Sequence, residues 1–210
     1  MALKKIYDIS LPLTVNTKVF PGDMPLQYNF VQHIEAGDKL NLSEFLATTH
    51  IGTHVDAPLH YLEQGKAIGE LDLDIFIGTC QLVKVDTTIK TSILPGEITR
   101  YGNLPERVLF CTTSENKYDE WTDSYRIPSI ELIDYLNRMG VKLIGIDTPS
   151  VDMVNASDAL IHKYIFKCEM LIIENLYLNE VPEGRYELIA LPLKFMELEA
   201  SPVRVILRSL

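Results

Sequence analysis

The chain has 210 residues, 47% of them hydrophobic and 23% charged, which is typical of a soluble globular protein with one sizeable core. A net charge of −10 argues against nucleic acid or an anionic membrane surface as a partner, because both require clustered lysine and arginine. No apolar run reaches membrane-spanning length, and the N-terminal residues become polar before an apolar run of signal-peptide length. We therefore expect a small-molecule substrate.

Short apolar runs rich in β-branched residues predict eight strands. They cover Gln27–Ile34, Ser43–Thr49, Phe76–Val85, Arg107–Cys111, Lys142–Ile146, Met170–Ile173, Glu187–Leu191 and Val203–Leu207. Helical patterns alternate with some of these runs, and no linker divides the chain. The prediction is an α/β protein, a single domain over residues 1–210, with a central mixed β-sheet flanked by a few helices.

Two segments carry helical periodicity. The segment Ser129–Met139 has apolar residues near a 3.6-residue spacing, with Pro128 before it and Gly140 after it as start and stop signals. A second helix is predicted over Ser157–Lys167, with Ser157 or Asp158 as its N-cap and Leu160, Tyr164 and Ile161 on its apolar face.

The three cysteines, Cys80, Cys111 and Cys168, are odd in number and far apart, and they show no C-x-x-C spacing. This pattern does not fit a disulfide framework. It predicts a reducing compartment, and we expect a cytoplasmic protein.

The stretch from His50 to His60 reads H-I-G-T-H-V-D-A-P-L-H and holds three of the five histidines and an aspartate. Evenly scattered histidines would give roughly a quarter of one in such a window, so composition alone does not produce this density. Imidazole and carboxylate are the usual ligands of zinc, manganese or iron. The stretch therefore predicts a metal site.

The backbone of this stretch is predicted to be extended, because its β-branched residues, Gly52 and Pro58 disfavour a helix. An extended chain points His50, His54, Asp56 and His60 to one face. A straight strand would nevertheless separate His50 from His54 by roughly 13 Å, too far for one ion. We therefore expect a bend at Gly52 and a short helix that begins at Pro58 and carries His60.

The pattern H-x-G-T-H-x-D-x-P-x-H resembles the signature of the cyclase family of metal-dependent hydrolases, which includes the bacterial kynurenine formamidases. The resemblance extends over nearly the whole chain. Segments that carry it are Ile6–Ser10, Phe20–Asp23, Leu143–Asp152, Tyr186–Leu193 and Ala200–Arg204.

This resemblance implies a site with two divalent metal ions, expected to be Zn²⁺, with Mn²⁺ as the alternative. It makes His50, His54 and Asp56 ligands of one ion, with Asp56 bridging to the second. It adds His162 and Glu174 as ligands of the second ion, with Glu174 also bridging. Two ions held in this way would activate a water molecule for attack on a carbonyl group.

The resemblance also gives roles to two residues that are not ligands. His60 is expected to be the catalytic acid and base, although a capping or structural role is the alternative. Phe20 stands where kynurenine formamidases have a tryptophan that lines the substrate site, so it is expected to bind the substrate or else to pack under its turn. Asp147 and Asp152 could line the site, or they could cap turns.

The leading hypothesis is an enzyme that hydrolyses N-formyl-L-kynurenine to L-kynurenine and formate in tryptophan degradation. A related hydrolase that opens a cyclic amide such as isatin is the first alternative, and the replacement of tryptophan by Phe20 motivates it. A metal-binding protein without catalysis is the second alternative. Relatives are commonly homodimers, so a homodimer is expected, and the strand-rich C-terminus could serve as its interface.

Overall fold

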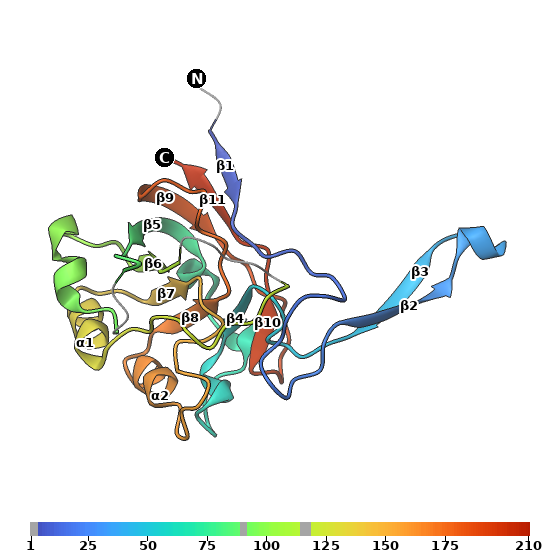
Figure 1. Ribbon diagram of the computed structural model, residues 1–210, viewed down its shortest axis with the longest axis horizontal. Coiled ribbons are helices and arrows are strands. Elements are labelled where there is room, and N and C mark those ends of the chain that lie inside the picture. Colours follow the sequence, from blue (N-terminus) through green and yellow to red (C-terminus); the bar gives the residue numbers. More distant parts are fainter. Residues whose placement is uncertain (1–3, 89–91, 114–118) are drawn as a thin grey trace.

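One large mixed sheet organises the computed structural model, which describes residues 4–88, 92–113 and 119–210 (Figure 1). In spatial order its nine strands are β1 (Ile6–Asp8), β11 (Ile206–Ser209), β9 (Gly184–Ile189), β5 (Ile77–Lys84), β6 (Arg107–Cys111), β7 (Leu143–Ile146), β8 (Leu171–Glu174), β4 (His54–Asp56) and β10 (Ala200–Pro202). Strands β5 to β8 are parallel, and the flanking pairs are antiparallel. The predicted α/β fold with a central mixed sheet is confirmed.

Both α-helices of the described residues, α1 (Ile130–Arg138) and α2 (Leu160–Lys167), pack on one face of this sheet. Helix α1 closely matches the predicted segment Ser129–Met139. The hydroxyl of Ser129 accepts a hydrogen bond from the amide of Leu132 (3.2 Å) and caps the first turn of the helix. Within the described ranges, no helix has the length and apolarity that crossing a bilayer requires.

Short 3₁₀ helices make up several of the connections. They are η1 (Ile34–Ala36), η2 (Pro58–His60), η3 (Ile68–Glu70), η4 (Leu73–Ile75), η5 (Pro95–Glu97) and η6 (Thr99–Tyr101). The segment η2 is the short helix predicted at Pro58, and Pro58 occupies its first turn, where a missing amide hydrogen costs nothing.

The sheet separates two apolar cores. On β6, for example, Val108 and Phe110 face the core beneath the helices, whereas Leu109 faces the core on the opposite side. This alternation follows from the two-residue period of a strand. Because both faces are covered, β6 to β8 are buried along their whole length, and they are apolar except for Arg107 at the start of β6 and Glu174 at the end of β8.

Several strand predictions need correction. The strands predicted over Gln27–Ile34 and Ser43–Thr49 are β2 (Gln27–Gln32) and β3 (Leu42–Leu46), but they pair only with each other in the described structure and lie outside the large sheet. Strands β1, β4 and β10 were not predicted as strands, because three residues are too few to show a periodicity. The predicted Val203–Leu207 strand is shifted to Ile206–Ser209.

The start of α2 also differs from its prediction. The helix begins at Leu160, and neither Ser157 nor Asp158 caps it. Instead, the carboxylate of Asp152 accepts hydrogen bonds from the first-turn amides of Ile161 and His162, both at 3.0 Å. Leu160, predicted on the apolar face, is 52% exposed, whereas Ile161 and His162 are buried.

Candidate active site

The bend predicted in the histidine stretch lies at Gly52, whose φ is +61°, a left-handed conformation that favours glycine. A Cβ atom there would also clash with the side chain of Leu13. Because of the bend, the rings of His50 and His54 lie 4.9 Å apart between centroids, instead of the roughly 13 Å of a straight strand. The prediction of a bend at this glycine is confirmed.

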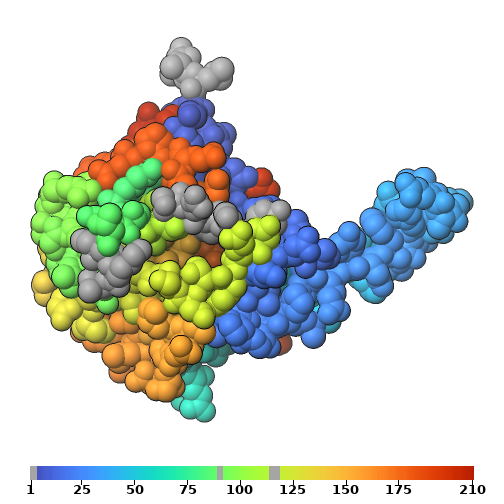
Figure 2. All heavy atoms as spheres, viewed as in Figure 1, coloured from blue at the N-terminus to red at the C-terminus, as the bar shows by residue number. Residues whose placement is uncertain are grey.

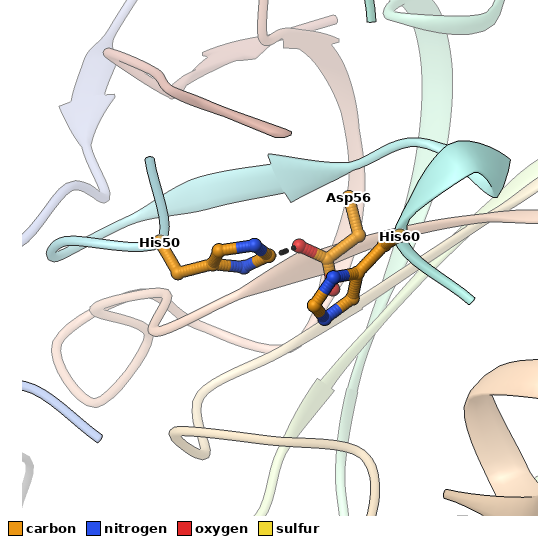
Figure 3. Close-up of side chains that lie close together, drawn as sticks. All are labelled: His50, Asp56 and His60. Carbon is orange, nitrogen blue, oxygen red and sulfur yellow. Dashed lines mark ion pairs between the residues drawn. The ribbon is translucent and has the colours of Figure 1, made fainter. Parts of the chain in front are cut away.

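Strand pairing and helix packing bring the distant residues to this stretch. Glu174, the last residue of β8, lies directly opposite His54 of β4 in the antiparallel register. His162 comes from the buried face of α2. Figure 3 shows His50, Asp56 and His60 of the local stretch with their side chains turned toward one another. The structure thus gathers the five predicted ligands and His60 in one place.

Two carboxylates occupy the centre of the cluster, and each directs its two oxygens to different histidines. Asp56 Oδ1 lies 3.0 Å from His50 Nδ1 and 3.3 Å from His54 Nε2, whereas Asp56 Oδ2 lies 3.5 Å from His162 Nε2. Glu174 Oε2 lies 3.4 Å from His54 Nε2, and Glu174 Oε1 lies 3.3 Å from His162 Nε2. Both carboxylates therefore span the gap between the His50–His54 pair and His162.

The donor atoms fit divalent metal ions. Within the described structure, His50 Nε2, His54 Nε2 and both oxygens of Asp56 are buried without a hydrogen-bond partner. Leaving such groups unsatisfied is costly, so they normally have a partner. Two groups of donors lie within 4.8 Å, one formed by His50, Asp56 and His60 and the other by His54, Asp56 and Glu174. Nitrogen and carboxylate donors in this arrangement match the ligand preferences of zinc or manganese.

In the cluster, histidines and carboxylates lie close together and shift one another's pKa values. Burial alone would lower the pKa of His54, but the carboxylates of Asp56 and Glu174 outweigh it and raise that pKa to about 10. Burial would raise the pKa of Asp56, yet the surrounding histidines hold it well below its usual value. The pKa of His162 is raised in spite of burial, through Asp152 first and then Asp56 and Glu174. Without a metal ion, protons on the histidines balance the carboxylates.

Outer partners orient the histidine rings. His54 Nδ1 lies 2.8 Å from the carbonyl oxygen of Gly52, and His162 Nδ1 lies 2.7 Å from Asp152 Oδ2. A carboxylate oxygen of Glu199 lies 3.4 Å from His50 Nε2, within ion-pair distance but without forming a hydrogen bond. Such partners fix the tautomer and direction of a metal-binding imidazole. No sequence pattern indicates a role for Glu199, and the pattern around Asp152 is compatible both with lining the site and with capping a turn.

Asp152 both caps α2 and holds His162, so the turn-capping alternative describes it only in part. Asp147 matches that alternative: both of its oxygens accept the amide of Thr112 (3.0 and 2.8 Å), and one accepts the Thr112 hydroxyl (2.6 Å). Asp147 therefore fixes the end of β6 beside the end of β7.

His60 lies on η2 beside the other histidines. Its ring centroid is 4.2 Å from that of His50, 4.2 Å from Tyr61 and 5.7 Å from His162. Burial lowers the pKa of His60 to about 4; Asp56 opposes this effect, and the nearby His50 and His162 reinforce it. A neutral His60 at pH 7 has a free lone pair and can accept a proton.

Phe20 takes part in an aromatic contact with Trp121, which is not one of the six clustered residues. Its ring packs edge-on against Trp121, with centroids 5.7 Å apart, and 37% of Phe20 is exposed. No aromatic contact within the described structure joins Phe20 to the six clustered residues. Trp121 is the single tryptophan of the chain, and no sequence pattern predicts that it lies beside Phe20.

Known proteins resemble this chain in fold and in sequence. The profile of the Cyclase family matches residues 7–153. The chain belongs to this family. It is 40% identical over 209 residues to a kynurenine formamidase of Bordetella petrii, covering 99% of this chain and all of that protein. The solved structure of a potential metal-dependent hydrolase with cyclase activity superposes with a TM-score of 0.84 at 28% identity, covering 99% of each chain. Isatin hydrolase A of Labrenzia aggregata shares the fold (TM-score 0.86, 20% identity, 98% of this chain and 94% of that chain).

Proposed function

We propose that this protein is a metal-dependent amide hydrolase that converts N-formyl-L-kynurenine and water to L-kynurenine and formate, a step of tryptophan degradation. The observation that carries the proposal is the pair of buried carboxylates, Asp56 and Glu174, each with its two oxygens directed at separate histidines. Identity of 40% over the whole length to a kynurenine formamidase supports the choice of substrate.

The same arrangement supports two divalent ions, with zinc as the expected metal and manganese as the alternative. His50 and His54 would hold one ion and His162 the other, while Asp56 and Glu174 would bridge them. Bound there, the ions would polarise the amide carbonyl and lower the pKa of a water molecule toward about 7. The carbonyl of Gly52 and the carboxylate of Asp152 would keep His54 and His162 in the ligating orientation.

His60 would move the proton. In its neutral form it accepts a proton from the attacking water and then donates it to the aniline nitrogen as the C–N bond breaks. Its position against His50 places it at the edge of the cluster, and burial keeps it neutral at pH 7. Because His60 also belongs to one of the two donor groups, metal content must be measured in any His60 variant.

Phe20 would contribute to binding the aryl ring of the substrate. A phenylalanine keeps an aromatic face but has less area than the tryptophan of the relatives and no indole N–H. The edge-on contact with Trp121 would hold the Phe20 ring in a fixed orientation.

The test is direct. Purified protein loaded with Zn²⁺ is incubated with N-formyl-L-kynurenine, and kynurenine is followed by absorbance and formate by enzymatic assay. We expect equal amounts of both products, loss of turnover with a chelator, and recovery when metal is restored. Absence of turnover in protein with two ions bound per chain would refute the proposal.

A second candidate is a hydrolase of cyclic amides, and the shorter aromatic residue Phe20 favours it by leaving room for a different ring system. Isatin is the probe. If isatin is opened orders of magnitude faster than formylkynurenine is cleaved, the cyclic-amide reading replaces the first one.

We place the protein in the cytoplasm. All three cysteines are free thiols, and Cys80 and Cys111 are buried. Free thiols are the rule in reducing compartments. Fractionation of cells that express the untagged protein would test this location.

A further inference from the structure

The metal cluster is closed on one side and open on the other. The side chains of His54, Glu174 and His162 are 2% to 4% exposed, whereas that of His50 is 18% exposed. The side chain of Glu199, next to His50, is 34% exposed. Exposure therefore increases from the centre of the cluster toward Glu199, and a substrate can approach the cluster from this side.

Glu199 is held in place by its backbone and by its side chain. It directly precedes β10, and its carbonyl oxygen accepts a hydrogen bond of 2.8 Å from the amide of Ala57, the residue after Asp56. One carboxylate oxygen, Oε1, accepts the hydroxyl of Thr49 and faces His50 Nε2. The other oxygen, Oε2, has no side-chain donor in the described part of the chain. Glu199 is therefore a positioned carboxylate with one oxygen available to a ligand.

The other carboxylates at the cluster already have roles. In the described structure, three carboxylates besides Glu199 contact the clustered histidines. Asp56 and Glu174 are buried at the centre, where the ions are expected. Asp152 caps α2 and holds His162. Of these four carboxylates, Glu199 is the one that lies at the open side of the cluster.

Other acidic side chains lie away from the cluster or do not contact it. Strands β2 and β3 form a ribbon that projects away from the body of the molecule, as Figures 1 and 2 show in light blue. Glu44 lies on this ribbon and accepts a hydrogen bond of 3.0 Å from Asn29 on the opposite strand. Glu197, two residues before Glu199, is exposed and has no hydrogen bond or ion pair with the clustered residues in the described structure.

Glu199 carries a negative charge that the chain leaves without a permanent cation. Burial would raise the pKa of Glu199, but the Thr49 hydroxyl, the backbone amide of Glu199, His50 and His60 lower it below its usual value. Among the described residues, no lysine or arginine pairs with Glu199, whose ion-pair contact is His50. An imidazole that binds a metal ion is neutral. In metal-loaded protein, the open side of the site therefore carries a carboxylate that can attract a cationic group of the substrate.

We infer that Glu199 binds a primary ammonium group of the substrate, and that the protein thereby selects amides that carry one. The inference rests on the proposed function, because N-formyl-L-kynurenine has an α-ammonium group. Six covalent bonds join its amide nitrogen to the ammonium nitrogen, a chain that spans about 7 Å when extended. An amide held at the cluster can therefore place its ammonium group beside Glu199 Oε2, and the ammonium supplies the missing N–H donor.

Two substrates that differ only in the ammonium group test the inference on zinc-loaded wild-type protein. One is N-formyl-L-kynurenine, and the other is its desamino analogue, in which hydrogen replaces the α-ammonium group. We expect the KM of the analogue to be about 10-fold to 100-fold higher, with similar kcat, because one hydrogen bond between charged groups is lost. Equal KM values would overturn the inference and leave the proposed function standing. Turnover of neither compound would overturn both.

The variant Glu199→Gln identifies the residue responsible. Glutamine keeps the shape and an acceptor for Thr49 but removes the charge, so the preference for formylkynurenine over the desamino analogue should disappear. Glu199→Asp, which keeps the charge on a shorter side chain, should retain part of the preference. Glu197→Gln is the matched control and should retain all of it. A Glu199→Gln protein with the wild-type preference would overturn the inference.

Metal content distinguishes substrate binding from orientation of His50. We expect Glu199→Gln to hold as many zinc ions per chain as the wild type, measured by mass spectrometry. Calorimetry should show that it binds the product L-kynurenine more weakly, by about the same 10-fold to 100-fold factor. Loss of zinc from Glu199→Gln, with an equal fall in kcat for both substrates, would show that Glu199 only orients His50 and would overturn the inference.

Discussion

The metal cluster and the β2–β3 ribbon are opposite kinds of incomplete structure. In the cluster, polar atoms of His50, His54 and Asp56 are buried without hydrogen-bond partners. In the ribbon, large apolar side chains such as Phe45 are exposed to water. Each region departs from a common pattern of folded proteins, since buried polar groups are normally paired and large apolar ones normally covered.

The difference indicates what each region binds. Buried imidazole nitrogens and carboxylate oxygens that converge can all coordinate one small cation, because such a cation carries positive charge and fits in a small space. An exposed aromatic face is satisfied only by another apolar surface of comparable area. Variants in the cluster should therefore change metal binding and turnover, whereas matched variants in the ribbon should not.

The largest effect is expected for Asp56→Asn. Asp56 contacts three histidines and carries the charge that both ions would share, so its removal should abolish metal binding and reduce turnover to background. Metal content by mass spectrometry and kynurenine release check this. Asp38→Asn, at the exposed tip of the ribbon, is the control and should retain both. Turnover by Asp56→Asn near that of the wild type would contradict the assignment.

The next effect is that of His60→Ala. If His60 transfers the proton, kcat should fall about 10²-fold to 10⁴-fold while metal content stays unchanged. The matched control is His33→Ala on the ribbon, which should leave kcat intact. Loss of one metal ion in His60→Ala would instead make His60 a ligand, as its membership of one donor group allows.

Acidification should weaken metal binding. Without metal, His54 has a pKa of about 10 and the pKa of His162 is also raised, so both rings are protonated at pH 7 and must release a proton to bind an ion. Affinity should therefore fall about 100-fold for each unit of pH decrease if both protons are displaced. Calorimetry in buffers of different ionisation enthalpy measures the released protons, and release of none would refute the arrangement.

The raised pKa of His54 also predicts how the stability of the metal-free protein changes with pH. The protonated His54 stabilises the metal-free fold fully below its unfolded pKa near 6.5, and this contribution is lost as the pH rises through about 10. We expect the Tm of metal-free protein to fall by several degrees from pH 7 to pH 10, and that of metal-loaded protein to fall less. A metal-free Tm that rises over this range would contradict it.

A smaller effect is expected for Asp152→Asn. Asp152 orients the His162 ring and caps α2, and an asparagine keeps the shape but loses the charge. Metal affinity should fall about 10-fold to 100-fold, with the helix content unchanged by circular dichroism. Asp158→Asn, in the same loop but exposed, should change neither. Equal affinities for the two variants would remove Asp152 from the site.

The smallest effect is expected for Phe20→Trp. Restoring the larger ring should lower KM for formylkynurenine by about 2-fold to 10-fold and change kcat little, because the added area contributes to binding. Phe45→Trp on the ribbon is the control and should leave KM unchanged. An unchanged KM in Phe20→Trp would show that Phe20 packs under its turn rather than against the substrate.

Local sequence was sufficient where the signal was local. The helix α1, its stop at Gly140, the strands β6 to β8, the bend at Gly52 and the first turn at Pro58 follow from residues that are neighbours in the chain. Their conformational preferences do not depend on distant contacts. The family resemblance added His162 and Glu174, which the residues alone did not distinguish from an ordinary helix histidine and a strand-end carboxylate.

Tertiary contacts decided the rest. Asp152 takes the place of the expected local cap of α2, through hydrogen bonds to residues nine and ten positions along the chain. The β2 and β3 patterns predicted strands correctly but could not say that they leave the sheet, since strand propensity does not name a pairing partner.

The sequence by itself determined which residue types are available for metal chemistry and where the chain must bend, because composition and local sterics are properties of short segments. Only the folded structure decided which of the carboxylate oxygens face which histidines, and which apolar residues remain outside. Those outcomes depend on the register between β4 and β8 and on the packing of α2, which bring together residues more than a hundred positions apart.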